Sequence, residues 1–145
     1  MTISSHAAKA KARGLQQWVM HQISDLTGIP CGKDEMIASR EMGQSGTDVR
    51  LIGEAKRMFP FSVECKRQEN WSIPAWIKQA KSNQEPGTEW LLFCRRNNEE
   101  AVVVMDAEAF FHLLRMYKRN TEVTLQHFGI TPEKEEIIYT RGRAK

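Results

Sequence analysis

Apolar and polar residues alternate over two neighbouring stretches of the chain, and this alternation predicts two strands. In residues 59–66 the apolar Phe61, Val63 and Cys65 are separated by single polar residues. A period of two is typical of a strand that buries one of its faces. The opposite face of this strand then carries Ser62, Glu64 and Lys66. Residues 46–52 follow a glycine turn and repeat the alternation, so they predict a second short strand.

A longer apolar spacing predicts a helix near the start of the chain. Leu15, Val19, Ile23 and Leu26 recur every three or four residues. This spacing places the four side chains on one face of a helix, which we expect over residues 4–27. Gly28 comes directly after this stretch and is a suitable stop.

Start signals predict two more helices. Ser72 is a suitable N-cap and Pro74 fits a first turn, which favours a helix over residues 75–81. Asp106 precedes a similar stretch, residues 107–117, in the same way. Four side chains of that last helix are expected in the core: Phe110, Phe111, Leu113 and Leu114.

Short apolar runs predict the remaining elements. Residues 34–40 predict a first strand, and residues 53–58 a short connecting helix. The dense apolar runs 90–94 and 101–105 are typical of strands covered on both faces. The C-terminal region is expected to add short strands or a packed extension, over residues 121–125 and 137–140.

Length and composition indicate one ordinary domain. The chain has 145 residues, of which 41% are hydrophobic and 27% charged, enough to bury a core without staples. No run is long enough to span a membrane, and residues 1–10 lack the apolar segment of a signal peptide. We therefore expect a single domain over residues 1–145, in the cytoplasm and away from membranes.

Cysteine usage and charge narrow the function classes. The three cysteines are an odd number without CxxC spacing, so neither a disulfide framework nor a zinc site is predicted. The four histidines are scattered and show no spacing of metal ligands. A formal net charge of +3 favours a polyanionic partner over an acidic one.

The two alternating strands also carry the residues whose side chains are suited to catalysis or metal binding. If the strands pair, Asp48 and Glu64 converge and Lys66 lies beside them. Two close carboxylates repel each other, so such a pair either raises one pKa or binds a cation. Carboxylate oxygens in this number suit Mg²⁺ or Mn²⁺.

At these residues the chain resembles the PD-(D/E)XK nuclease superfamily, in particular small phage-type endonucleases and Holliday-junction-resolvase-like members. Asp48 matches the first acid of the motif, and Glu64-Cys65-Lys66 matches the (D/E)XK triplet. Thr47 stands where the motif has proline. The resemblance implies an α/β fold with a restriction-endonuclease-like αβββαβ core, a mixed central sheet flanked by helices. That core would cover residues 8–117, with a C-terminal extension over residues 118–145.

The resemblance also implies further site residues. Gln79, on the helix after the triplet, matches a glutamine that points back toward the active site, although Asn83 replaces the tyrosine of the QxxxY signature. The main-chain carbonyl of Cys65 would join the metal ligands. Family members often carry a glutamate on the first helix, where this chain has Gln16 and Gln17. Glu41 is a candidate substitute for that glutamate, and an exposed carboxylate without a role is the alternative.

The function implied is a Mg²⁺- or Mn²⁺-dependent endonuclease that hydrolyses DNA phosphodiester bonds, in a bacterium or a phage-infected host cell. Asp48, Glu64, Lys66 and Gln79 would be catalytic. Basic and turn residues around the site are expected to contact DNA: Lys11, Arg13, Ser45, Arg67, Lys78, Lys81, Arg141 and Arg143.

Substrate and activity leave alternatives open. The resemblance suggests branched DNA, such as the four-way junction of DNA recombination, for which a two-fold symmetric homodimer would be expected. Flap, nicked or linear duplexes are alternatives. So is a nucleic-acid-binding module that keeps the nuclease fold without cleavage, and so is an interaction protein whose acids line an exposed strand.

Overall fold

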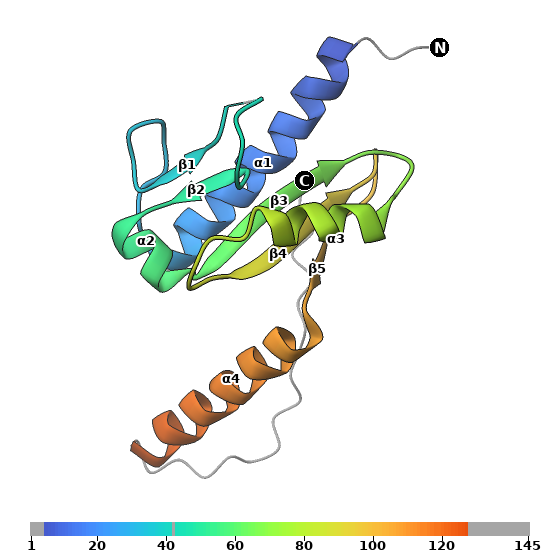
Figure 1. Cartoon of the computed structure of the whole chain (residues 1–145). Coiled ribbons are helices and arrows are strands. Elements are labelled where there is room, and N and C mark those ends of the chain that lie inside the picture. Colours follow the sequence, from blue (N-terminus) through green and yellow to red (C-terminus); the bar gives the residue numbers. More distant parts are fainter. Residues whose placement is uncertain (1–4, 42, 128–145) are drawn as a thin grey trace. The chain divides into compact units, whose positions relative to one another are not determined.

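The computed structural model describes residues 5–41 and 43–127 of the chain (Figure 1). Its contacts divide the chain into two compact units, Met1–Ala107 and Glu108–Lys145. The first unit holds a five-stranded sheet with three helices, and almost all of the last helix falls in the second. A single domain over residues 1–145 stays a prediction.

The sheet is mixed, as expected from the sequence. Its strands are β1 (Ile37–Ser39), β2 (Val49–Leu51), β3 (Phe61–Arg67), β4 (Glu89–Arg95) and β5 (Val102–Met105), and they lie in that order across the sheet. Only the central pair β3 and β4 runs parallel, and the other neighbours are antiparallel. The predicted restriction-endonuclease-like α/β core is therefore confirmed.

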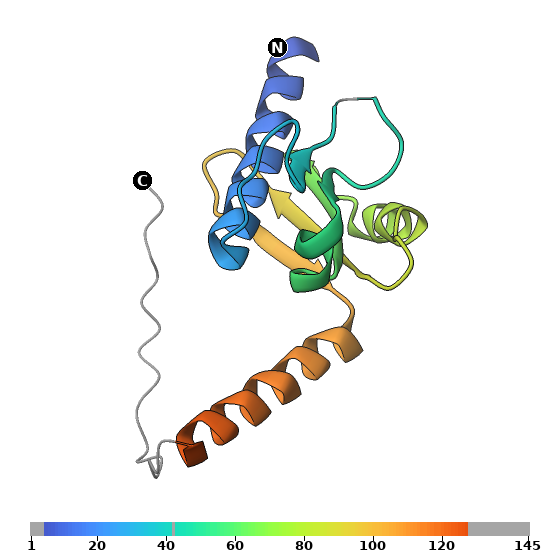
Figure 2. The same ribbon diagram turned by 90° about the vertical axis from the view of Figure 1, so that its left-hand side faces the viewer.

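Helix α1 (Ser5–Thr27) covers one face of the sheet (Figure 2). Leu15, Val19 and Ile23 are at most 2% exposed, and they pack in one cluster with apolar side chains of β1, β2 and β3. The helix ends at Gly28, whose φ of +71° is a left-handed conformation that favours glycine. The predicted helix is therefore confirmed to within one residue. Its predicted apolar face is wrong at Leu26, which lies in the last turn and is 72% exposed.

Helix α3 (Ile73–Ser82) covers the opposite face. Trp76 and Ala80 pack against Trp90, Leu92 and Cys94 of β4, which alternate with the β4 residues that face α1. The connection from β3 to the parallel β4 passes through α3 and therefore has to cross from one end of the sheet to the other. A short helix, α2 (Gly53–Met58), joins β2 to β3.

Helix α4 (Ala107–His127) is longer than the sequence predicted. It continues beyond Tyr117 to His127, so the short strand expected at residues 121–125 is wrong. Neither glycine nor proline interrupts the sequence between residue 107 and Gly129, so nothing breaks a helix once it has started. The strand expected at residues 137–140 lies outside the described residues.

The predicted burial holds for only part of the chain. Within the second unit, Phe110, Phe111, Leu113 and Leu114 of α4 are 40–55% exposed, and their place in a core stays a prediction. Val102 and Val103 of β5 are 42% and 49% exposed, because β5 is the edge strand. Coverage on both faces therefore holds for β4 alone. No helix in residues 5–41 and 43–127 is both long and apolar enough to cross a membrane.

Candidate active site

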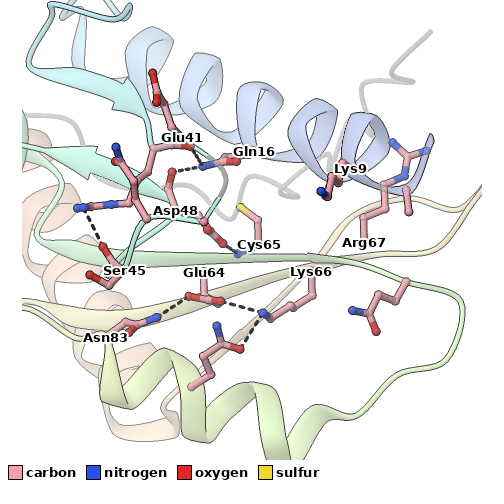
Figure 3. Close-up of a pocket in the computed structure, with 18 residues that line it drawn as sticks. Lys9, Gln16, Glu41, Ser45, Asp48, Glu64, Cys65, Lys66, Arg67 and Asn83 are labelled. Atoms are coloured by element: carbon pink, nitrogen blue, oxygen red, sulfur yellow. Dashed lines mark hydrogen bonds and ion pairs between the residues drawn. The ribbon is translucent and has the colours of Figure 1, made fainter. Parts of the chain in front are cut away.

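A hollow of about 540 Å³ opens where α1, the segment before β2, the end of β3 and α3 meet (Figure 3). The four predicted catalytic residues all line it: Asp48, Glu64, Lys66 and Gln79. The predicted metal-site residues Glu41 and Cys65 line it as well. Residues from three separate elements thus meet at the place that the strand pattern indicated.

Asp48 is fixed against β3 by two hydrogen bonds. Its main-chain N–H donates to the carbonyl of Val63 at 2.8 Å. Its Oδ2 accepts a hydrogen bond from the main-chain N–H of Cys65 at 2.7 Å. The antiparallel pairing of Val49 with Val63 sets this register. The carboxylate therefore lies beside the strand that carries Glu64.

Glu64 is only 3% exposed, and both of its oxygens have partners. The Nζ of Lys66 lies 2.9 Å from Oε1, and the side-chain amide of Asn83 donates to Oε2 at 3.2 Å. Lys66 also donates to Oε1 of Gln79 at 2.8 Å. The strand alternation places Glu64 and Lys66 on the same side of β3, where α3 supplies both amides (Figure 3).

The site raises the pKa of one acid. Burial and, second, the negative charge of Glu64 raise the pKa of Asp48 from its ordinary value of 3.8 to about 6. The hydrogen bond from the Cys65 N–H and the positive charges of Lys66 and Arg40 act in the opposite direction, but they do not cancel the increase. Asp48 and Glu64 are therefore a repelling pair in a partly buried place, which a cation would relieve.

The residues present fit a hard divalent cation. Within the described part of the chain, no group of three or more His, Cys, Asp or Glu side chains is suited to hold a metal. The side chains that could hold a cation are two carboxylates, Asp48 and Glu64, both of which line the hollow. Mg²⁺ is commonly bound in this way, through one or two carboxylates with water and substrate oxygens completing its shell.

The side chain of Cys65 is partly buried against the core. It packs against the cluster under α1, and burial raises the pKa of its thiol well above the ordinary range. A neutral, core-facing thiol is neither a nucleophile nor a metal ligand. What Cys65 contributes to the site comes from its main chain.

The two candidates for the missing helix acid are placed differently. Gln16 of α1 is 4% exposed, lines the hollow, and donates from its amide to the main-chain carbonyls of Arg40 and Asp48. Glu41 also lines the hollow, but its side chain is exposed and points away from Asp48 and Glu64 (Figure 3). Gln16 therefore ties the Asp48 segment to α1, while Glu41 stays apart from the acid pair.

The predicted DNA contacts separate into groups. Ser45 and Arg67 line the hollow, and the Nε of Arg67 is buried with no hydrogen-bond partner among the described residues. Lys11, Lys78 and Lys81 line no part of it, and Lys81 lies over the Trp90 ring instead. Arg13 lines a neighbouring hollow. Arg141 and Arg143 lie outside the described residues.

Several residues of the hollow were not among the predicted site residues, and Lys9 and Asn83 are two of them. Lys9 lines it from α1, one helical turn before Arg13. Asn83 holds Glu64, although the sequence indicated it only as a departure from a family signature. Its spacing of four residues from Gln79 was the available signal, because residues four apart lie on one face of a helix.

Comparison with known proteins agrees with this geometry. A family model described as "Phage putative PDDEXK endonuclease" matches residues 12–141. Searches of curated proteins and of solved structures found no match. The matched region contains every residue of the acid pair, the lysine and the two amides.

Proposed function

Because the chain belongs to the family of phage PD-(D/E)XK endonucleases, we propose that it is a metal-dependent deoxyribonuclease that hydrolyses phosphodiester bonds. The observation that supports this most directly is the meeting of Asp48, Glu64 and Lys66 in one hollow, together with the raised pKa of Asp48. Nucleases with this motif generally use divalent metals, and the Asp48–Glu64 pair with the Cys65 carbonyl is the donor set for Mg²⁺ or Mn²⁺.

The bound cation would supply a Lewis acid that neutralises charge on the phosphate and lowers the pKa of water. The side chains of the protein would bind the phosphate and orient the water. Lys66 is a compact cation 2.9 Å from Glu64, so it can neutralise a phosphate oxygen and orient the attacking water. In hydrolysis the water oxygen bonds to phosphorus, the P–O bond to the leaving oxygen breaks, and that oxygen takes up a proton.

Two amides from α3 keep these groups in place. Gln79 accepts a hydrogen bond from Lys66, and Asn83 donates one to Glu64. Without them the ammonium and the carboxylate would pair only with each other and could rotate together. Arg67 lines the hollow, so its guanidinium can donate to a phosphate oxygen of the substrate.

The finer substrate class is also part of the proposal. We propose a preference for branched DNA, such as the four-way junction, as the resolvase-like resemblance implies, with flap, nicked and linear duplexes as the alternatives. A four-way junction has two-fold symmetry, so its cleavage on opposing strands calls for a homodimer with two active sites.

A cleavage panel tests the activity. We expect the protein with Mg²⁺ to nick supercoiled plasmid, and chelation of the metal to stop it. Glu64→Gln and Lys66→Ala should lower the cleavage rate by about 10²-fold or more. Glu89→Gln is the matched control, since it makes the same change at an exposed position on the neighbouring strand.

The same panel, extended to linear, flap and four-way-junction DNA, tests the substrate preference. Variants that remain folded by circular dichroism and still cut at the parental rate would disprove the assignment of Glu64 and Lys66. DNA binding by a parent that never cleaves would favour the alternative, a binding module with a nuclease fold.

A further inference from the structure

A second hollow, of about 900 Å³, adjoins the candidate active site. It is lined by α1, by the segment before β1, and by β1 and β2. The two hollows share Arg40, Glu41 and Gln44, which therefore form a ridge between them. Helix α1 runs along both, with Lys9 in the first hollow and Arg13 in the second.

The second hollow is basic but has no acid pair. Four cations line it against two acids: Arg13, Lys33, Arg40 and Arg50 against Asp34 and Glu41. Arg13 and Lys33 are exposed, and across residues 5–41 and 43–127 neither of them takes part in an ion pair. Such a surface attracts phosphate groups, yet it does not gather carboxylates for a metal.

One cation of this hollow is held in position by the main chain. The guanidinium of Arg50 donates to the carbonyls of Lys33 and Glu35, at 3.3 and 3.1 Å. Because these acceptors are neutral, the positive charge of Arg50 is not cancelled. The segment that carries Lys33 is thereby attached to β2, so the basic groups keep a defined arrangement.

The ridge between the hollows is braced from inside. Arg40 donates from Nε to the carbonyl of Thr47 at 2.6 Å and from Nη1 to that of Ser45 at 2.9 Å. Gly46 has a φ of +104°, and a Cβ built there would lie 3.2 Å from the Arg40 guanidinium. This φ favours glycine, and a side chain at position 46 would also crowd the Arg40 guanidinium in the ridge.

From these observations we propose that the second hollow binds the sugar-phosphate backbone of the nucleic-acid strand that is not cut. The first hollow takes the strand that is cut, and the ridge lies between the two strands. This inference rests on the proposed nuclease function. It adds a second binding surface, formed by Arg13, Lys33 and Arg50, on the far side of the ridge from the acid pair.

The test compares one labelled strand in two forms, alone and within a forked duplex. Binding of the full-length protein is measured by fluorescence anisotropy without divalent ions, so that nothing is cleaved. For Arg13→Gln/Lys33→Gln we expect about tenfold weaker binding to the fork and less than about twofold to the single strand. The slope of log K against log salt on the fork should fall by about two.

Two control variants separate charge from structure. Arg13→Lys/Lys33→Arg keeps both charges and should bind the fork as the parent does. Lys56→Gln/Arg57→Gln removes two charges from α2, which lines neither hollow, and should leave the difference between fork and single strand unchanged. Both residues are in ion pairs near the surface, whose loss costs little stability.

Two results would overturn the inference. An equal loss on both forms would mean that the second hollow follows the cut strand, and no loss on either would mean that it contacts no nucleic acid. The proposed function fails separately, when the parent protein does not cleave any of these substrates with Mg²⁺.

Discussion

Asp48 lies in a place where its negative charge destabilises the folded protein. Its pKa of about 6, against an ordinary 3.8, means that the folded protein binds this proton more tightly than the unfolded chain does. The protonated Asp48 therefore contributes its full share to the free energy of unfolding at acid pH. This contribution is lost as pH rises from about 4 to beyond 6. Above that range the ionised carboxylate costs at most about 3 kcal/mol.

Asp48→Asn should therefore make the protein more stable and inactive. The amide oxygen can still accept the Cys65 N–H, while the repulsion with Glu64 disappears. We expect Tm at about pH 8 to rise by several degrees, with no gain at about pH 4. Thermal melts followed by circular dichroism at both pH values measure this. A variant that melts below the parent at about pH 8 would contradict it.

The same proton should compete with metal. Below a pKa of about 6 the neutral Asp48 is a poor ligand, so affinity for Mg²⁺ or Mn²⁺ should fall roughly tenfold for each pH unit in that range. Calorimetric titration of the parent with Mn²⁺ at about pH 5 and about pH 8 checks this. Asp48→Asn is the control and should bind weakly at both pH values, and a pH-independent affinity of the parent would exclude Asp48 as a ligand.

At the scale of elements, α3 acts on the site through two amides one turn apart. Asn83 contacts Glu64 and is expected to position it without touching the substrate. Asn83→Ala should therefore lower kcat about tenfold and leave the KM for DNA unchanged. Ser82→Ala, the neighbouring position, is the control. An increase in KM with unchanged kcat would show instead that Asn83 binds the substrate.

Helices and strands with a clear periodicity could be predicted from the sequence. The contacts between side chains of different elements could not. The spacing of Leu15, Val19 and Ile23 specified α1, and the alternation in β3 placed Glu64 and Lys66 on one side. The role of Asn83 depends on the angle at which α3 crosses β3, which no local pattern encodes. The resemblance supplied Gln79 because its residue type matched, whereas Asn83 differs from the family residue.

The prediction that β5 is covered on both faces was wrong for a related reason, since burial also depends on neighbouring elements. An apolar run says that side chains avoid water, but it does not say which neighbour covers them. β4 has neighbours on both sides and β5 has one, although their sequences are equally apolar. The length of α4 was underestimated, because no glycine or proline before Gly129 marks where the helix ends.

At the scale of the whole molecule, association of two copies is the prediction to test. Within the second unit, six large apolar side chains of α4 are 40–66% exposed, and such a surface is stabilised when another apolar surface covers it. If two copies associate through this helix, Phe111→Lys/Leu114→Lys should convert a dimer to a monomer. Light scattering measures the mass, with Arg119→Ala on the same helix as control.

The same mass measurement can contradict the dimer. A parent chain that has the mass of a monomer at every concentration, alone and on four-way-junction DNA, would contradict the homodimer and with it the symmetric cleavage of junctions. Cleavage of one strand at a time would then be the remaining mode of action.

Among the described residues, nothing after Asn83 lines the hollow that holds the acid pair. The groups that would break the bond are thus confined to the first part of the chain. β4 supports them by pairing along the whole of β3, whereas the exposed positions of β5 and α4 can change with less effect on the site. Mutations in that later region can change how two copies associate or which DNA is bound, while the groups that hydrolyse the bond stay in place.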